Sequence, residues 1–168
     1  YMLKNWIVNG ETLPNTGNVL QLTVEKTMTI SAVFEREYYR QSMTLARGWN
    51  WVSSYIGEAW PVDQMNSYVN RVVGQFDELV NDPEYGLVGG LTELTPGMAY
   101  KVEGLQRFTT TFRGHLMTSP ITLRRGWNWV AYPWTNSRLV GQAIPNAEEG
   151  DYLVSQQGFA EYADGSWE

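Results

Sequence analysis

Two tryptophans, Trp60 and Trp134, are the residues of this chain whose type and spacing best suit contact with a ligand. Each follows a Trp-Asn-Trp phrase and lies beside a proline, in Trp60-Pro61 and in Pro133-Trp134. Such positions predict loops, and aromatic rings on loops either contact ligands or cover a core. We take this pair as candidate ligand-binding residues, with packing as the alternative.

The Trp-Asn-Trp phrases contain a further aromatic pair in each copy. Trp49 and Trp51, like Trp127 and Trp129, are two residues apart, so on a strand both rings point to the same face. Parallel indoles could form a platform for sugar rings. However, a tryptophan can bury about 200 Å², and an identical pair in two copies favours a shared packing need. We therefore expect these rings in the core.

His115 is the single histidine of the chain. A catalytic triad or a histidine metal site needs further residues in suitable geometry, which one histidine on a predicted strand does not provide. We expect a surface residue.

Acidic residues gather at two places, but no Asp-x-Asp-x-Asp-Gly loop for calcium is present. A glycosidase needs two carboxylates at a fixed separation, and the sequence singles out no such pair. Solvated charge is the favoured interpretation, with no metal, no cofactor and no enzymatic activity expected; a hydrolase with an unrecognised carboxylate pair is the weaker alternative. The acidic residues are Asp77, Glu78, Asp82 and Glu84, then Glu148, Glu149 and Asp151.

Charge and composition exclude other partners. The net charge is −6 and the sequence pI is about 4.8, so the chain repels the phosphate backbone that supplies most nucleic-acid affinity. No cysteine is present, and no apolar run approaches the roughly 20 residues of a membrane span. Because the chain begins at Tyr1, we expect a fragment of a longer protein.

A repeated phrase defines the domain organisation. Residues 44–52 return almost unchanged as residues 122–130, an offset of 78. The expected units are a first repeat at residues 43–120 and a second, truncated repeat at residues 121–168. A small β segment at residues 1–36 and a linker at residues 37–42 precede them.

The expected fold class is mainly β, or β-rich α+β, with antiparallel strands and one short helix in each repeat. One helix is expected to begin at Pro61 and run to Val73, because Met65, Tyr68, Val69, Val72 and Val73 have helical spacing. The other is expected between a Ser137 cap and Pro145. Expected strands and turns comprise Leu3–Gly10, Val19–Val24, Met28–Phe34, a type II turn at Pro96-Gly97, and a hairpin of Tyr152–Gln156 and Phe159–Tyr162.

Residues 13–17, Leu-Pro-Asn-Thr-Gly, match the sortase anchoring motif letter for letter. Sorting requires an apolar stretch and a basic tail directly after the motif, whereas predicted strands follow here. We interpret these residues as an inter-strand turn.

Two family resemblances extend this interpretation. Trp6, Asn9-Gly10 and Thr29–Phe34 resemble the end of a divergent internalin-type B repeat. Leu45 with Gly48–Trp51, and Leu123 with Gly126–Trp129, resemble the Gly-Trp-Asn-Trp repeat modules of bacterial surface proteins, as do Leu94, Pro96, Gly97 and Tyr100 in the first repeat. The resemblances imply a secreted or cell-surface location and bring no catalytic residues.

The expected function is a non-catalytic extracellular repeat region that acts as a structural stalk or as an adhesion module. The expected partner is a host or bacterial surface protein, or a glycan. The alternative is a carbohydrate-binding module that uses exposed Trp and Tyr side chains.

Overall fold

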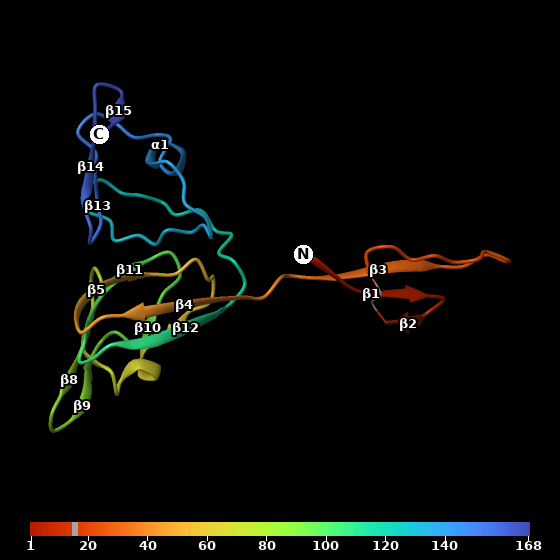
Figure 1. The fold of residues 1–168 in the computed structure, drawn as a ribbon, viewed down its shortest axis with the longest axis horizontal. Coiled ribbons are helices and arrows are strands. Elements are labelled where there is room, and N and C mark those ends of the chain that lie inside the picture. Colours follow the sequence, from red (N-terminus) through yellow and green to blue (C-terminus); the bar gives the residue numbers. More distant parts are fainter. Residues whose placement is uncertain (15–16) are drawn as a thin grey trace. The chain divides into compact units, whose positions relative to one another are not determined.

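The computed structural model describes residues 1–14 and 17–168, which form two compact units, residues 1–39 and residues 40–168. Both are built from antiparallel strands, with one short α-helix and one 3-10 helix in the second (Figure 1). The prediction of a mainly β protein is confirmed. None of the described helices has the length and apolar character needed to cross a membrane.

The first unit is a three-stranded sheet of β1 (Met2–Val8), β2 (Glu11–Leu13) and β3 (Ile30–Glu35), with β1 in the middle. Asn9 and Gly10 connect β1 to β2 with φ angles of 51° and 86°, as a tight hairpin turn requires. Asn9 also holds the approach to β3, since its N–H donates to Thr29 O and its Oδ1 accepts the Thr29 N–H, both at 2.9 Å.

The strand expected at Val19–Val24 does not form. Val19 is 74% exposed and Val24 is 66% exposed. Alternation of apolar residues predicts a strand only where a partner strand and a core accept it, and here neither is provided. The turn expected at residues 13–17 includes Asn15 and Thr16, which lie outside the described residues.

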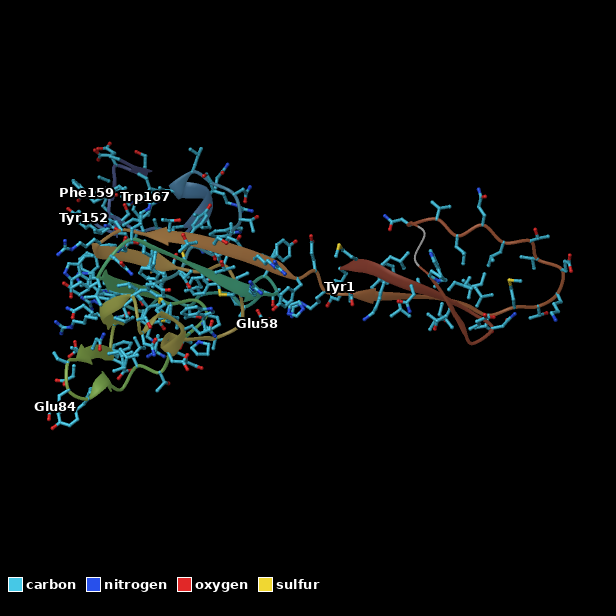
Figure 2. The ribbon with its side chains drawn as sticks, turned by 60° about the horizontal axis from the view of Figure 1, so that its bottom comes forward. Tyr1, Glu58, Glu84, Tyr152, Phe159 and Trp167 are labelled. Atoms are coloured by element: carbon cyan, nitrogen blue, oxygen red, sulfur yellow. The ribbon has the colours of Figure 1, made fainter. Side chains whose placement is uncertain are left out.

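The second unit contains both repeats, and the first repeat forms its main sheet, in the order β5-β11-β7-β8-β9. Two separate two-stranded sheets accompany it, one of β12 with β4 and one of β10 with β6. The strands are β4 (Tyr39–Leu45), β5 (Gly48–Ser53), β6 (Trp60–Pro61), β7 (Val69–Val73), β8 (Glu78–Asp82), β9 (Gly86–Gly89), β10 (Glu93–Leu94), β11 (Ala99–Gly104) and β12 (Phe108–Gly114). The β8–β9 hairpin projects from the rest of this unit, with Glu84 near its tip (Figures 1 and 2).

The type II turn predicted before β11 is confirmed. Gly97 has a φ of 84°, and the Met98 N–H donates to Thr95 O at 3.2 Å. β11 then lies between β5 and β7 in the sheet, with Val102 fully buried.

The helix expected from Pro61 to Val73 is wrong beyond its first turn. Residues Val62–Met65 form a 3-10 helix, and Val69–Val73 form strand β7. A β-bulge explains the error, because Val69 pairs with Gly104 and Arg71 pairs with Glu103, which leaves one extra residue between them. The bulge turns Val69 and Val72, three residues apart, to the same buried face, and this spacing imitates a helix.

The second repeat contains α1 (Val140–Ala143) and a sheet of β13 (Tyr152–Val154), β14 (Phe159–Ala163) and β15 (Ser166–Trp167). The predicted hairpin is confirmed. The predicted helix is a single turn, and it begins after Leu139 rather than at a Ser137 cap. The second copy of the repeated phrase forms no regular strand; only Val130 makes a bridge, to Met98 of the first repeat.

Candidate functional site

The tryptophans of the first phrase point outward. Trp49 is 44% exposed and Trp51 is 41% exposed, whereas Asn50 and Val52 are buried. The prediction that both rings share one face is therefore correct, and the prediction that they form the core is wrong. Strand alternation turns Asn50 and Val52 inward instead, so the indoles lie on the outer face of the sheet.

Asn50 is buried because it builds the turn before β5. Its Oδ1 accepts the Ala46 N–H at 2.8 Å, and its Nδ2 donates to Ala46 O at 2.9 Å and to Gly48 O at 2.8 Å. Gly48 has a φ of 86°, which a glycine adopts without strain. The repeated phrase thus encodes a turn closed by an asparagine.

The second phrase reproduces this turn. Asn128 Oδ1 accepts the Arg124 N–H at 3.0 Å, and Nδ2 donates to Arg124 O at 2.7 Å and to Gly126 O at 2.8 Å. Gly126 has a φ of 96°. The flanking Trp127 is 68% exposed, so it is even more accessible than Trp49.

Lys101 of β11 joins the two phrases. Its Nζ lies 4.8 Å from the centroid of the Trp51 ring and 4.7 Å from that of Trp129. Both distances are within the range of cation–π attraction. The ammonium group therefore bridges one tryptophan of each repeat.

Two glutamines make equivalent contacts, each with the Trp-Asn-Trp phrase of the other repeat. Gln75, in the β7–β8 turn, donates from Nε2 to Trp127 O at 2.6 Å and accepts the Trp129 N–H at Oε1 at 2.8 Å. Gln156, in the β13–β14 turn, donates to Trp49 O at 2.9 Å and accepts the Trp51 N–H at 2.8 Å. Each repeat thus closes the free edge of the other's tryptophan segment.

Backbone hydrogen bonds continue this joint between the repeats. The Ala99 N–H donates to Trp129 O at 3.1 Å, and the Ala131 N–H donates to Gly97 O at 2.9 Å. Ala131 is buried at this contact. We call the contacts of Gln75, Gln156, Lys101 and these two bonds the inter-repeat joint.

The two candidate ligand-binding tryptophans lie in different surroundings. Trp60 is 8% exposed and packs against Phe112, with ring centroids 4.9 Å apart. Its expected role in ligand contact is therefore wrong, because the ring is part of the core. Trp134 is half-buried, stacks under the Arg138 guanidinium at 4.7 Å, and packs beside Tyr132 at 5.2 Å.

His115 is a partly exposed residue with a defined partner. Its Nδ1 lies 2.6 Å from Glu58 Oε1, and its backbone N–H donates to Glu58 Oε2 at 2.8 Å. The Gly57 N–H donates to His115 O at 2.8 Å, so this pair ties the loop after β5 to the chain after β12.

The acidic residues make local hydrogen bonds. Glu78 pairs with Arg71, and Asp82 accepts the N–H groups of Glu84 and Tyr85 at 2.8 and 2.9 Å. Asp151 accepts the Glu148 N–H at 2.9 Å. In the described ranges, no three His, Cys, Asp or Glu side chains are grouped to hold a metal ion.

Sequence reasoning missed Gln75, Gln156 and Lys101. The only available signal was that each glutamine follows an apolar strand at a matching place, in Val73-Gly74-Gln75 and Val154-Ser155-Gln156. Comparison of the chain with protein-family models, with curated proteins and with solved structures found no match.

Proposed function

We propose that this chain is a non-catalytic extracellular repeat region of a bacterial surface or secreted protein, which acts as a structural stalk or an adhesion module. The observation that carries the proposal is the inter-repeat joint, in which Gln75 and Gln156 bind the backbone of opposite repeats. A joint of this kind makes two tandem repeats mechanically continuous, as a stalk or a presented adhesive tip requires. The Gly-Trp-Asn-Trp and internalin-type resemblances support the location.

Single-molecule pulling tests this mechanical role. The chain has no cysteine, so Arg40→Cys and Glu168→Cys provide unique attachment points at the ends of the second unit. We expect residues 40–168 to unfold in one event. The double variant Gln75→Ala and Gln156→Ala should unfold at a lower force or in two separate events. Gln157→Ala, in the same turn as Gln156, should change neither the unfolding force nor the number of events. Two independent events in the otherwise unaltered chain would contradict the proposal.

Carbohydrate binding is the second candidate, favoured by the outward tryptophans. Trp49 and Trp127 are the more exposed members of the two pairs, and neither makes the cation–π contact of Trp51 and Trp129. Exposed indole faces suit stacking against sugar rings. The candidate contact residues are therefore Trp49 and Trp127, with Trp134 retained from the sequence prediction.

A glycan-array screen of the full chain tests this candidate. Binding that is lost in Trp49→Ala or Trp127→Ala but kept in Trp134→Ala would support the outer face of the phrases as the binding surface. Loss in Trp134→Ala alone would instead support the loop site. A blank array with folded protein would exclude the glycans displayed and favour a protein partner.

A further inference from the structure

Three side chains on the outer face of the main sheet lie in one row across three neighbouring strands. Trp49 of β5 is paired with Glu103 of β11, and Glu103 is paired with Arg71 of β7. Directly paired residues of antiparallel strands point to the same face, with Cβ atoms about 4.5–5.5 Å apart. We call these three residues the Trp49 row. The row places an indole beside an acceptor and a donor of hydrogen bonds.

The Trp49 row is open to solvent. Trp49 is 44% exposed, the Arg71 side chain is 43% exposed, and Glu103 is half-buried. The strand neighbours Val72 and Val102 are fully buried, because alternation turns them to the opposite face. The row therefore lies on the side of the sheet that a ligand can reach.

The two polar members of the row are held in place by neighbouring side chains. Asn70 Nδ2 donates to Glu103 Oε2 at 2.7 Å, and Arg71 Nε donates to Glu78 Oε2 at 2.9 Å. A carboxylate has about four acceptor sites and a guanidinium has five N–H donors, so both groups keep capacity for a ligand. The row therefore presents fixed hydrogen-bonding groups, which reduces the entropy lost on binding.

The indole end of the row is fixed by the inter-repeat joint. Gln156 donates to Trp49 O at 2.9 Å and accepts the Trp51 N–H at 2.8 Å. The other edge of β5 is paired with β11. Trp49 is thus carried by a backbone that is held on both edges, as a precise stacking platform requires.

We propose that the Trp49 row binds a neutral sugar chain of at least two pyranose rings. One ring stacks its apolar C–H face on Trp49 and directs hydroxyl groups to Glu103. The next ring reaches Arg71, because three neighbouring strands span about 10 Å, a length that two linked rings cover. This inference rests on the second candidate function, carbohydrate binding, and names its site and its class of ligand.

Hydroxyl groups match the row better than charged groups do. A hydroxyl both donates and accepts, so the hydroxyls of one sugar chain can bond to Glu103 and to Arg71. An acidic sugar would bring a second carboxylate close to that of Glu103, and Glu78 already occupies part of the Arg71 guanidinium. The net charge of −6 adds to this repulsion. The row therefore favours neutral sugars.

The same reasoning separates Trp49 from Trp127. Trp127 is 68% exposed, so its ring is the more accessible of the two. It lies outside the described strands, however, and strand pairing therefore sets no row of polar side chains beside it. A bare indole supplies stacking without the hydrogen bonds that orient a sugar. We therefore assign the sugar site to Trp49 and keep Trp127 as the comparison.

Titration calorimetry of the full chain with named sugars tests the proposal. The neutral probes are cellotetraose and N-acetyllactosamine, with glucose as the single ring and sialylated N-acetyllactosamine as the acidic counterpart. We expect saturable binding of at least one neutral oligosaccharide, and binding of glucose at least about tenfold weaker. Sialylated N-acetyllactosamine should bind more weakly than the neutral parent sugar.

Variants of the row give the matched test. Trp49→Ala should weaken binding about tenfold or more, and Trp49→Phe should restore part of it, because a smaller aromatic ring still stacks. Glu103→Gln should weaken binding of neutral sugars about fivefold and narrow the difference between the neutral and the sialylated sugar. Glu93→Gln, which removes one carboxylate from β10, should change neither. Urea denaturation checks that each variant is folded.

The outcomes separate this inference from the function on which it rests. Binding that survives Trp49→Ala and is lost in Trp127→Ala or Trp134→Ala would overturn the Trp49 row, while carbohydrate binding would stand. Equal or tighter binding of the sialylated sugar would overturn the preference for neutral ligands. If the folded chain bound none of the probes, the sugar site at the Trp49 row would be rejected, and a blank glycan array would reject the carbohydrate function with it.

Discussion

Gln75 and Gln156 are 81 residues apart and each closes the backbone edge that belongs to the other's repeat. Gln75 binds Trp127 and Trp129, and Gln156 binds Trp49 and Trp51, with hydrogen bonds of 2.6 to 2.9 Å. A side-chain amide can satisfy a backbone C=O and a backbone N–H two residues apart at the same time. The exchange shields the edge of β5 and the extended backbone of residues 127–129, which would otherwise be open to pairing with other chains.

Removal of either glutamine should therefore destabilise residues 40–168. Gln75→Ala and Gln156→Ala each break two hydrogen bonds to the backbone, and we expect each to lower the free energy of unfolding by about 1–2 kcal/mol. Urea denaturation measures the change. Gln157→Ala should have little effect, and equal losses in all three variants would contradict the role of the joint.

Lys101 should stabilise the joint through its charge. Lys101→Met keeps a long side chain between Trp51 and Trp129 but removes the cation, and we expect a loss of about 0.5–1 kcal/mol. Tryptophan fluorescence should change, because the ammonium no longer faces both rings. Unchanged stability and emission would show that the aliphatic stem alone fills this space.

Trp60 and Trp49 should differ sharply when each is changed to alanine. Trp60 is 8% exposed and Trp49 is 44% exposed. We expect Trp60→Ala to lower the free energy of unfolding by about 3–5 kcal/mol, since it leaves a cavity beside Phe112, and Trp49→Ala to lower it by less than about 1 kcal/mol. Thermal unfolding of the two variants measures this difference, and similar melting temperatures would show that the burial of Trp60 does not stabilise the fold.

The pKa of the Tyr152 phenol should lie above its ordinary value. A hydrogen bond to the Glu161 carboxylate raises the pKa of the Tyr152 phenol above 10.0, with smaller effects from burial and from the charge of Glu161. A raised folded-state pKa contributes stability below the unfolded pKa, which is lost as the pH rises through the folded value. Ultraviolet titration measures the ionisation of the phenols, and subtracting the titration curve of Tyr152→Phe isolates the contribution of Tyr152. In the Glu161→Gln variant, we expect the pKa of Tyr152 to return toward 10. Figure 2 shows Tyr152 near Phe159, at the surface of the second repeat. An identical titration midpoint for Tyr152 in the unaltered chain and in Glu161→Gln would contradict the role of Glu161 in raising this pKa.

The elements predicted well are those that local chemistry specifies. The Pro96-Gly97 turn needs only a fixed proline and a glycine with positive φ, and the Tyr152–Tyr162 hairpin needs only two apolar runs around a turn. The helix prediction for Val69–Val73 was wrong because a β-bulge gives buried residues the same spacing as a helix. The bulge depends on the partner strand β11, which lies 30 residues further along the chain.

The sequence by itself determined the duplication, the mainly β class and the turns, because each depends on residue type and short-range backbone preference. Only the tertiary structure decided which face of β5 is inside. Trp49 and Trp51 alternate with Asn50 and Val52, and either pair could have faced the core until the Asn50 side chain closed its turn there. The glutamine contacts of the inter-repeat joint likewise join residues that are 52 to 107 positions apart, which only folding brings together.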